Sequence, residues 1–125
     1  MIPHGAQKLL GWFGGYGLSA TLGWLTDGAG LPFPVALAVV VAESVGALAL
    51  IVGVATRAAA LGILAVMIGA VLTTHLSNGF FMNWDGTQPG EGVEFHLLAA
   101  TVAIGAAIYG GGRGSVDAWL ARRRS

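Results

Sequence analysis

Three long apolar runs dominate the pattern of hydrophobic and polar positions, and they predict helices over residues 33–53, 58–76 and 93–112. Each run approaches the roughly 20 residues that a helix needs to cross a hydrocarbon core of about 30 Å. The apolar part of the third run is the shortest, because the glycines Gly110–Gly112 end it. The pattern predicts an all-α integral membrane bundle with three transmembrane helices.

The basic residues orient this predicted bundle. The short connection Val54–Arg57 makes the first two helices an antiparallel hairpin. Five arginines then fall on one side of the membrane, namely Arg57, Arg113, Arg122, Arg123 and Arg124. Lys8 falls on the other side. Because cytoplasmic loops are enriched in Lys and Arg, we expect the arginines to be topology anchors on the cytoplasmic side and the loop Ser77–Gly92 to face outward.

The N-terminal residues 1–32 have a less regular pattern. Leu9–Leu25 is apolar and aromatic but contains five glycines. It is either a poor fourth membrane helix or an outer-face segment whose aromatic rings lie at the membrane interface, where Trp and Tyr concentrate. The glycines favour the interfacial interpretation.

The C-terminal residues 113–125 predict a short amphipathic helix in a basic tail. Ser115 is a candidate N-cap, since a serine side chain can accept from the free N–H groups of a helix start. Val116, Trp119 and Leu120 share one helix face, and three arginines follow. Each arginine near an anionic leaflet contributes about 1 kcal/mol. We expect this tail to anchor the C-terminus on the cytoplasmic side.

Composition narrows the class of protein. The 125 residues are 55% hydrophobic and 10% charged, against about 25% charged residues in soluble domains. The length suits a single membrane domain, 1–125. The net charge of zero gives no reason to expect a nucleic-acid partner. The absence of cysteine excludes disulfides, thiolate metal sites and thiol redox chemistry by the chain itself.

Glu43 is the main candidate for chemistry, because it lies in the middle of the first apolar run. A charged side chain at that depth costs about 2.5–3.5 kcal/mol on insertion scales. A protonated glutamate there could donate a hydrogen bond to a ligand carbonyl or pass on a proton; alternatively, it could bond a neighbouring helix and fix its register. Arg57 lies about 20 Å further along the helical path. A polar partner must therefore come from another helix or from the residues around His75 and His96.

The histidines are the next candidates. His4, His75 and His96 all fall on the outer side of the predicted topology. Histidine titrates near neutral pH and carries protons or binds metals. Three acidic residues could join them, namely Glu91, Glu94 and Asp85. The sequence has neither HExxH nor CxxC, so no metal site is predicted. The histidines are either interfacial hydrogen-bonding residues or part of a proton-relay or ligand site that includes Glu94, His4 and Lys8.

Several stretches together resemble the DoxX family of small membrane proteins. They are His4–Gly17, the glutamate Glu43, Gly53–Leu61, His75–Trp84, Gln88–His96 and Gly111–Asp117. The resemblance implies a four-helix membrane bundle whose first helix ends near His4–Gly5. The chain is then expected to lack most of that helix, or Met1 is not the true start. Leu9–Leu25 resembles the outer-face connection that follows the first helix in the family.

The family resemblance also implies a cellular location and a role. DoxX-like proteins are multi-pass proteins of the bacterial or archaeal cytoplasmic membrane, and some are subunits of a thiosulfate:quinone oxidoreductase or belong to complexes that handle oxidative and thiol stress. We therefore expect an accessory subunit of a quinone-linked or oxidative-stress redox complex, not an enzyme by itself, with quinone as a candidate ligand and no other cofactor predicted. Its expected partners are the lipid bilayer and other membrane or redox subunits, or further copies of itself. The alternatives are an assembly subunit without a ligand site and a small proton-coupled transporter.

Overall fold

The computed structural model describes residues 1–124, and within this range every regular element is a helix and none is a strand. Three elements are single π-helical turns, with one extra residue per turn, and one is a short 3-10 turn. The elements in chain order are α1 (Ile2–Leu10), α2 (Gly17–Gly23), η1 (Trp24–Gly28), α3 (Phe33–Val41), η2 (Ala42–Gly46), α4 (Ala47–Val52), α5 (Thr56–Ala70), η3 (Val71–His75), η4 (Leu76–Asn78), α6 (Glu94–Tyr109) and α7 (Val116–Arg124).

Two continuous helices are long and apolar enough to cross a membrane within the described range: Phe33–Val52, which joins α3, η2 and α4, and Thr56–Asn78, which joins α5, η3 and η4. Pro34 lies in the first turn of the first helix, where its missing N–H costs no bond. Gly53, with φ of 72°, ends it. Only 28% and 22% of the most apolar stretches are buried, so these helices do not form the core of a soluble fold.

The third predicted helix is shorter than the sequence suggested. α6 has 16 residues, Glu94–Tyr109, instead of the expected 93–112. At a rise of 1.5 Å per residue it covers about 24 Å, less than the roughly 30 Å of a hydrocarbon core. It ends because Gly110 and Gly112 have φ of 75° and 71°, values that glycine adopts readily. The structure therefore has two clear spanning helices, and α6 is a shorter apolar helix.

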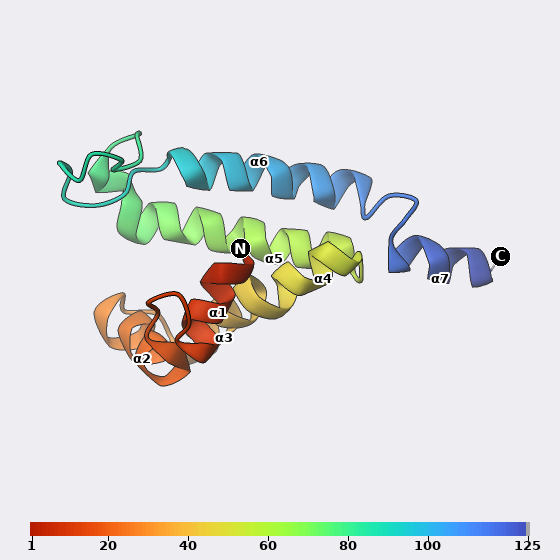
Figure 1. Cartoon of the computed structure of the whole chain (residues 1–125), viewed down its shortest axis with the longest axis horizontal. Helices are drawn as coiled ribbons and strands as arrows, with labels where there is room; N and C mark the ends of the chain where they lie inside the picture. Colours follow the sequence, from red (N-terminus) through yellow and green to blue (C-terminus); the bar gives the residue numbers. More distant parts are fainter. Residues whose placement is uncertain (125) are drawn as a thin grey trace.

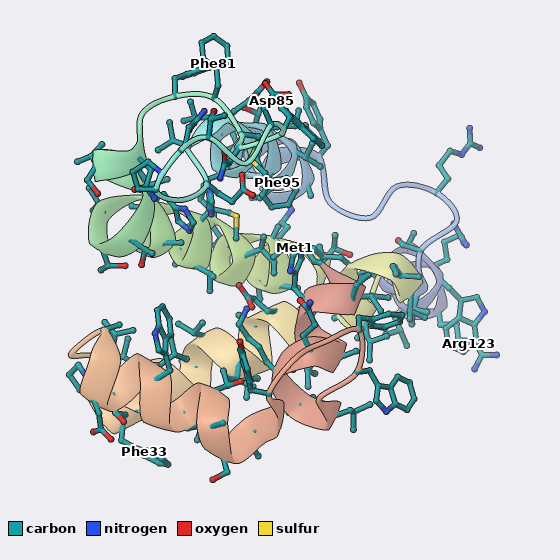
Figure 2. All side chains as sticks on the ribbon, turned by 60° about the vertical axis from the view of Figure 1, so that its left-hand side comes forward. Met1, Phe33, Phe81, Asp85, Phe95 and Arg123 are labelled. Atoms are coloured by element: carbon teal, nitrogen blue, oxygen red, sulfur yellow. The ribbon has the colours of Figure 1, made fainter. Side chains whose placement is uncertain are left out.

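The helices form two groups that meet along α5 (Figure 1). In one group, α5 and α6 run antiparallel and side by side, with the connecting loop at one end and α7 near the other. In the second group, α1, α2 and the helix Phe33–Val52 pack on one another. Met1 reaches the contact between the groups, where it packs with Phe95 against the core residues Ile63 and Met67 (Figure 2).

The N-terminal segment does not form a fourth spanning helix. α1 ends at Gly11, where φ is 71°, and the chain then turns through Phe13 with φ of 53°. Helical structure resumes at Gly17 and continues only to Gly28. Positive φ values interrupt a helix, so the glycine-rich run Leu9–Leu25 is two helical pieces and a turn. The alternative of a poor fourth membrane helix is therefore wrong.

α1 packs directly on the middle of the first long helix. Its residue Gly5 is buried, and a Cβ atom built there would lie 2.7 Å from both the Glu43 carbonyl oxygen and the Ser44 Cα. A side chain at position 5 would push the two helices apart. Glycine at this position is therefore what lets α1 reach the centre of the helix Phe33–Val52.

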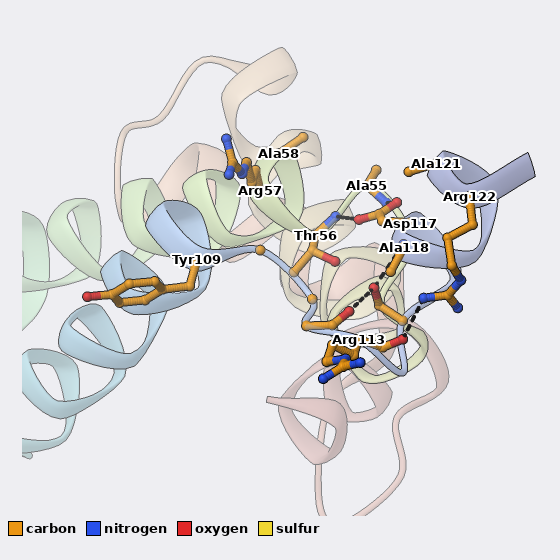
Figure 3. A pocket seen from close by; sticks show the side chains of 14 residues that line it. Ala55, Thr56, Arg57, Ala58, Tyr109, Arg113, Asp117, Ala118, Ala121 and Arg122 are labelled. Carbon is orange, nitrogen blue, oxygen red and sulfur yellow. Dashed lines mark hydrogen bonds between the residues drawn. The ribbon is translucent and has the colours of Figure 1, made fainter. Parts of the chain in front are cut away.

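α7 is attached to the start of α5. The Ser115 Oγ accepts a hydrogen bond from the Ala118 N–H at 3.1 Å, which confirms the predicted N-cap. The Asp117 carboxylate accepts from the N–H groups of Ala55 and Thr56, both at 2.8 Å (Figure 3). These bonds hold the pKa of Asp117 below its ordinary value, chiefly through the Thr56 N–H. A carboxylate from α7 thus caps the N-terminus of α5.

Candidate functional site

A cavity of about 540 Å³ lies between the two groups of helices. Such a volume falls within the roughly 300–1,000 Å³ of small-molecule sites. Its walls are mostly apolar, and the polar residues that line it are His4, Lys8, Glu43, Thr73, Thr74, His75, Glu91 and His96. The lining residues Thr73, Thr74 and Glu91 are exposed, whereas Glu43 and His96 are buried. The cavity therefore leads from an open edge to a polar interior.

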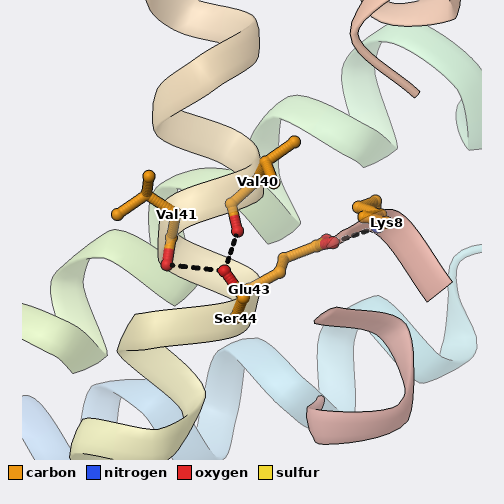
Figure 4. Close-up of polar contacts among 5 residues, drawn as sticks. All are labelled: Lys8, Val40, Val41, Glu43 and Ser44. Atoms are coloured by element: carbon orange, nitrogen blue, oxygen red, sulfur yellow. Dashed lines mark hydrogen bonds and ion pairs between the residues drawn. The ribbon is translucent and has the colours of Figure 1, made fainter. Parts of the chain in front are cut away.

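An ion pair between Lys8 and Glu43 forms the deep wall of this cavity (Figure 4). The Glu43 side chain is 8% exposed and the Lys8 side chain 25%. Lys8 follows Gly5 by three residues, so both lie on the face of α1 that meets the long helix. The close approach allowed by Gly5 thus brings the ammonium group of Lys8 to the carboxylate.

The Lys8 ammonium compensates the charge of the Glu43 carboxylate, which lowers the free-energy cost of placing that carboxylate in an apolar helix. Removing one partner of a buried pair typically costs about 3–5 kcal/mol, because the other charge is left uncompensated. The sequence correctly predicts that the polar partner of Glu43 comes from another helix and is not Arg57. It places Lys8 at the outer interface, however, whereas the structure places it against the middle of the long helix. The neighbouring Ser44 is satisfied locally, because its hydroxyl donates to the Val40 carbonyl at 2.5 Å.

Glu43 and His75 both lie in π-helical turns, η2 and η3. A π-helical turn inserts one residue into an α-helix, changes the direction of the following side chains and is frequent at functional sites. Both turns have side chains on the same cavity. The sequence contains no proline or other marker that predicts them, so this feature was missed.

The rings of His75 and His96 lie in contact with each other in the lining of the cavity. Their ring centroids are 4.1 Å apart, with the planes inclined by 37°. His75 Nδ1 donates to the Glu91 backbone carbonyl at 2.8 Å, which leaves the Nε2 atom of a neutral ring as an acceptor. His96 Nδ1 is buried and makes no hydrogen bond of good geometry within residues 1–124, although the Gly92 backbone lies near enough to interact with the His96 ring. A buried polar atom without a partner is costly and indicates a place for an additional group.

The remaining sequence candidates divide between the cavity and the loop. His4 lines the cavity, and its ring lies 6.0 Å from that of Phe95. Glu94 is not among the lining residues, because its carboxylate turns to accept from the Met82 N–H at 3.2 Å. The Glu91 carboxylate likewise accepts from the Asn83 N–H at 2.6 Å. These two carboxylates therefore hold the loop between η4 and α6.

The predicted topology anchors gather away from this cavity. Arg57, Arg113 and Arg122 line a second, more open cavity beside α7. The guanidinium of Arg123 lies 3.8 Å from the centre of the Trp119 ring, a cation–π arrangement. The side chain of Arg124 lies outside the described part of the chain. Among the residues described, no group of three or more His, Asp or Glu side chains is arranged to hold a metal ion.

The DoxX family model matches residues 1–76 of the 125 residues. This chain belongs to the DoxX family. It is therefore a membrane protein of that family, in agreement with its two long apolar helices. The matched range contains the cavity residues His4, Lys8, Glu43 and His75 and ends before His96. Neither a curated protein nor a solved structure matches this DoxX chain.

Proposed function

We propose that this DoxX-family protein is an accessory membrane subunit of a redox complex, and that it holds a quinone-type ring in the cavity between α1 and the α5–α6 pair. The observation that carries the proposal is the buried His96 Nδ1, which makes no hydrogen bond of good geometry to any described residue and lies in an apolar cavity beside the Lys8–Glu43 pair. A ligand with a hydrogen-bonding oxygen would satisfy this atom.

The lining of the cavity fits an apolar ring with polar oxygens. Val66, Met67 and Phe95 supply apolar surface for the ring and its substituents. A carbonyl oxygen is an acceptor, and both His96 Nδ1–H and the Lys8 ammonium are donors. Placing the acceptor between them removes the desolvation cost of the unpaired imidazole nitrogen.

Protons and electrons would take different routes. Reduction of a quinone to a quinol takes up two electrons and two protons. The His75 and His96 rings both line the cavity, so they are the candidate groups for passing protons to the ligand. Because the chain contains no cysteine, it supplies no dithiol to donate electrons. The electrons would therefore come from a partner redox subunit.

The proposed orientation places the loop end of the cavity outward in a prokaryotic cytoplasmic membrane. The support is the concentration of Arg57, Arg113 and Arg122 around the second cavity, beside α7. The positive-inside rule then makes the arginine end and the C-terminus cytoplasmic.

The test is equilibrium binding of a short-chain quinone to the purified protein in lipid nanodiscs. Quenching of tryptophan fluorescence is a suitable signal, since Trp24 lines the cavity. We expect saturable binding that weakens about tenfold in His96→Leu, the effect of losing one hydrogen bond in an apolar site. Asp85→Asn is the matched control, because Asp85 is exposed on the loop. Non-saturable quenching, or equal affinities in His96→Leu and Asp85→Asn, would overturn the proposal.

A further inference from the structure

The second cavity, of about 640 Å³, lies where the start of α5, the turn after α6 and the helix α7 meet (Figure 3). Thr56 and Tyr109 line it, and they mark the N-terminal end of α5 and the C-terminal end of α6. Two apolar helices end here together. Because an apolar helix that crosses a bilayer ends near the lipid headgroups, we expect headgroups beside this cavity.

The lining of this cavity is strongly basic. Arg57 comes from α5, Arg113 from the turn and Arg122 from α7, so three separate parts of the chain each contribute an arginine to the lining. The same lining contains one carboxylate, Asp117, and the Arg122 guanidinium donates to the Arg113 carbonyl at 3.3 Å. Both Asp117 oxygens accept from the N–H groups of Ala55 and Thr56. The carboxylate is therefore committed to capping α5.

A buried hydroxyl in the same lining points independently to a ligand. Thr56 is 3% exposed, and its Oγ1 forms no hydrogen bond to any described residue, although it lies near enough to the Asp117 carboxylate to help lower its pKa. A Cβ atom at Gly111 would lie 2.7 Å from this oxygen and 2.6 Å from the Ser115 Cβ. Glycine at 111 thus lets the turn after α6 pack closely against Thr56 and Ser115.

We infer that this cavity binds the phosphate group of an anionic phospholipid at the end of the α5–α6 pair. A planar guanidinium donates two parallel hydrogen bonds to phosphate oxygens, which gives geometric selectivity beyond charge attraction. The Thr56 hydroxyl adds a neutral donor. The exposed apolar side chains Ile108 and Tyr109 beside the cavity offer a surface for an acyl chain. Arg57 and Arg113 therefore bind lipid, in addition to setting topology.

The experiment is native mass spectrometry of the full chain in mild detergent, titrated with phosphatidylglycerol and, separately, with zwitterionic phosphatidylcholine. We expect phosphatidylglycerol to bind about tenfold more tightly. The double variant Arg57→Gln/Arg113→Gln should bind phosphatidylglycerol about 30-fold more weakly, since each arginine near an anionic headgroup contributes roughly a fivefold gain. The control Arg123→Gln, which removes a charge stacked on Trp119 outside this lining, should change binding less than twofold.

Two further measurements test the lipid site, one with a Thr56 variant and one with inorganic phosphate as a competitor. Thr56→Val keeps every arginine and should weaken binding about threefold to tenfold, so it carries the test if the double variant does not fold. Competition with inorganic phosphate separates the two sources of the phosphate group. Competition at millimolar concentration supports a phosphate site that prefers lipid. Equal affinity for inorganic phosphate and phosphatidylglycerol would overturn the lipid assignment. Equal binding of both lipids, or an equal loss in Arg123→Gln and the double variant, would overturn the site itself.

Discussion

The two cavities handle charge in opposite ways. The cavity between α1 and the α5–α6 pair contains a cation and an anion that contact each other, Lys8 and Glu43, and both are at least three-quarters buried. The cavity beside α7 has more positive than negative charge, and its arginines are exposed. The difference follows from the surroundings, because a charge in an apolar interior is costly without an opposite charge beside it, whereas water screens an exposed charge. In this molecule the buried charges form a close ion pair, whereas the arginines at the other end are exposed to solvent.

The largest expected effect is the difference in unfolding free energy between removing a charge from the buried ion pair and removing one from the exposed cavity. Lys8→Leu leaves the Glu43 carboxylate buried without its partner, and we expect a loss of about 3 kcal/mol in unfolding free energy. The matched change Arg113→Leu, at the open end, should cost less than about 1 kcal/mol. Thermal or denaturant unfolding in detergent measures both. Equal losses would contradict the contrast between the two cavities.

The next effect tests how α1 reaches Glu43. Gly5→Ala places a methyl group against the backbone of Glu43 and Ser44, so it should cost about 1–3 kcal/mol through overpacking. Gly23→Ala is the control, because no heavy atom lies within 4 Å of a Cβ there. We expect the control to gain up to about 1 kcal/mol from improved helix propensity. If both variants are equally stable, α1 does not pack as closely as described.

The smallest effect concerns the cap that α7 provides to α5. Asp117→Asn keeps the shape of the side chain but weakens its bonds to the N–H groups of Ala55 and Thr56, so the melting temperature at pH 7 should fall. The native pKa of Asp117 is lowered from 3.8, so its stabilisation is present above that value and is lost as pH falls through the native pKa.

The wild-type and Asp117→Asn melting temperatures should therefore converge as the pH falls below the ordinary aspartate value of 3.8. Asp85→Asn, at an exposed position on the other loop, is the control and should match the wild type throughout. A constant difference between wild type and Asp117→Asn at every pH would contradict an ionised cap.

The sequence predicts the fold class and the long helices well, because hydropathy is a local property that survives folding. The predicted ranges 33–53 and 58–76 agree closely with Phe33–Val52 and Thr56–Asn78. The end of α6 at Tyr109 was placed three residues too late, since the glycines that follow it belong to a turn. The presence of these apolar helices is thus predictable from their residues, whereas their exact ends depend on backbone φ values.

The site was predictable in its members but not in its arrangement. Glu43 and the histidines stand out as polar residues in apolar surroundings. The pairing of Lys8 with Glu43 has no local signature, because it depends on contact between segments 35 residues apart. The cap from Asp117 to Thr56 joins residues 61 apart for the same reason. Gly5 is the one usable hint, since a glycine one helical turn before a lysine allows that lysine to approach another helix.

The central claim is that Lys8 and Glu43 stabilise each other across the contact between α1 and the first long helix. A double-mutant cycle tests it most directly, with unfolding free energies measured for Lys8→Leu, Glu43→Leu and the double variant. We predict that each single variant loses about 3 kcal/mol and that the double variant is more stable than either, since two leucines leave no buried charge. Losses that simply add in the double variant would contradict the claim.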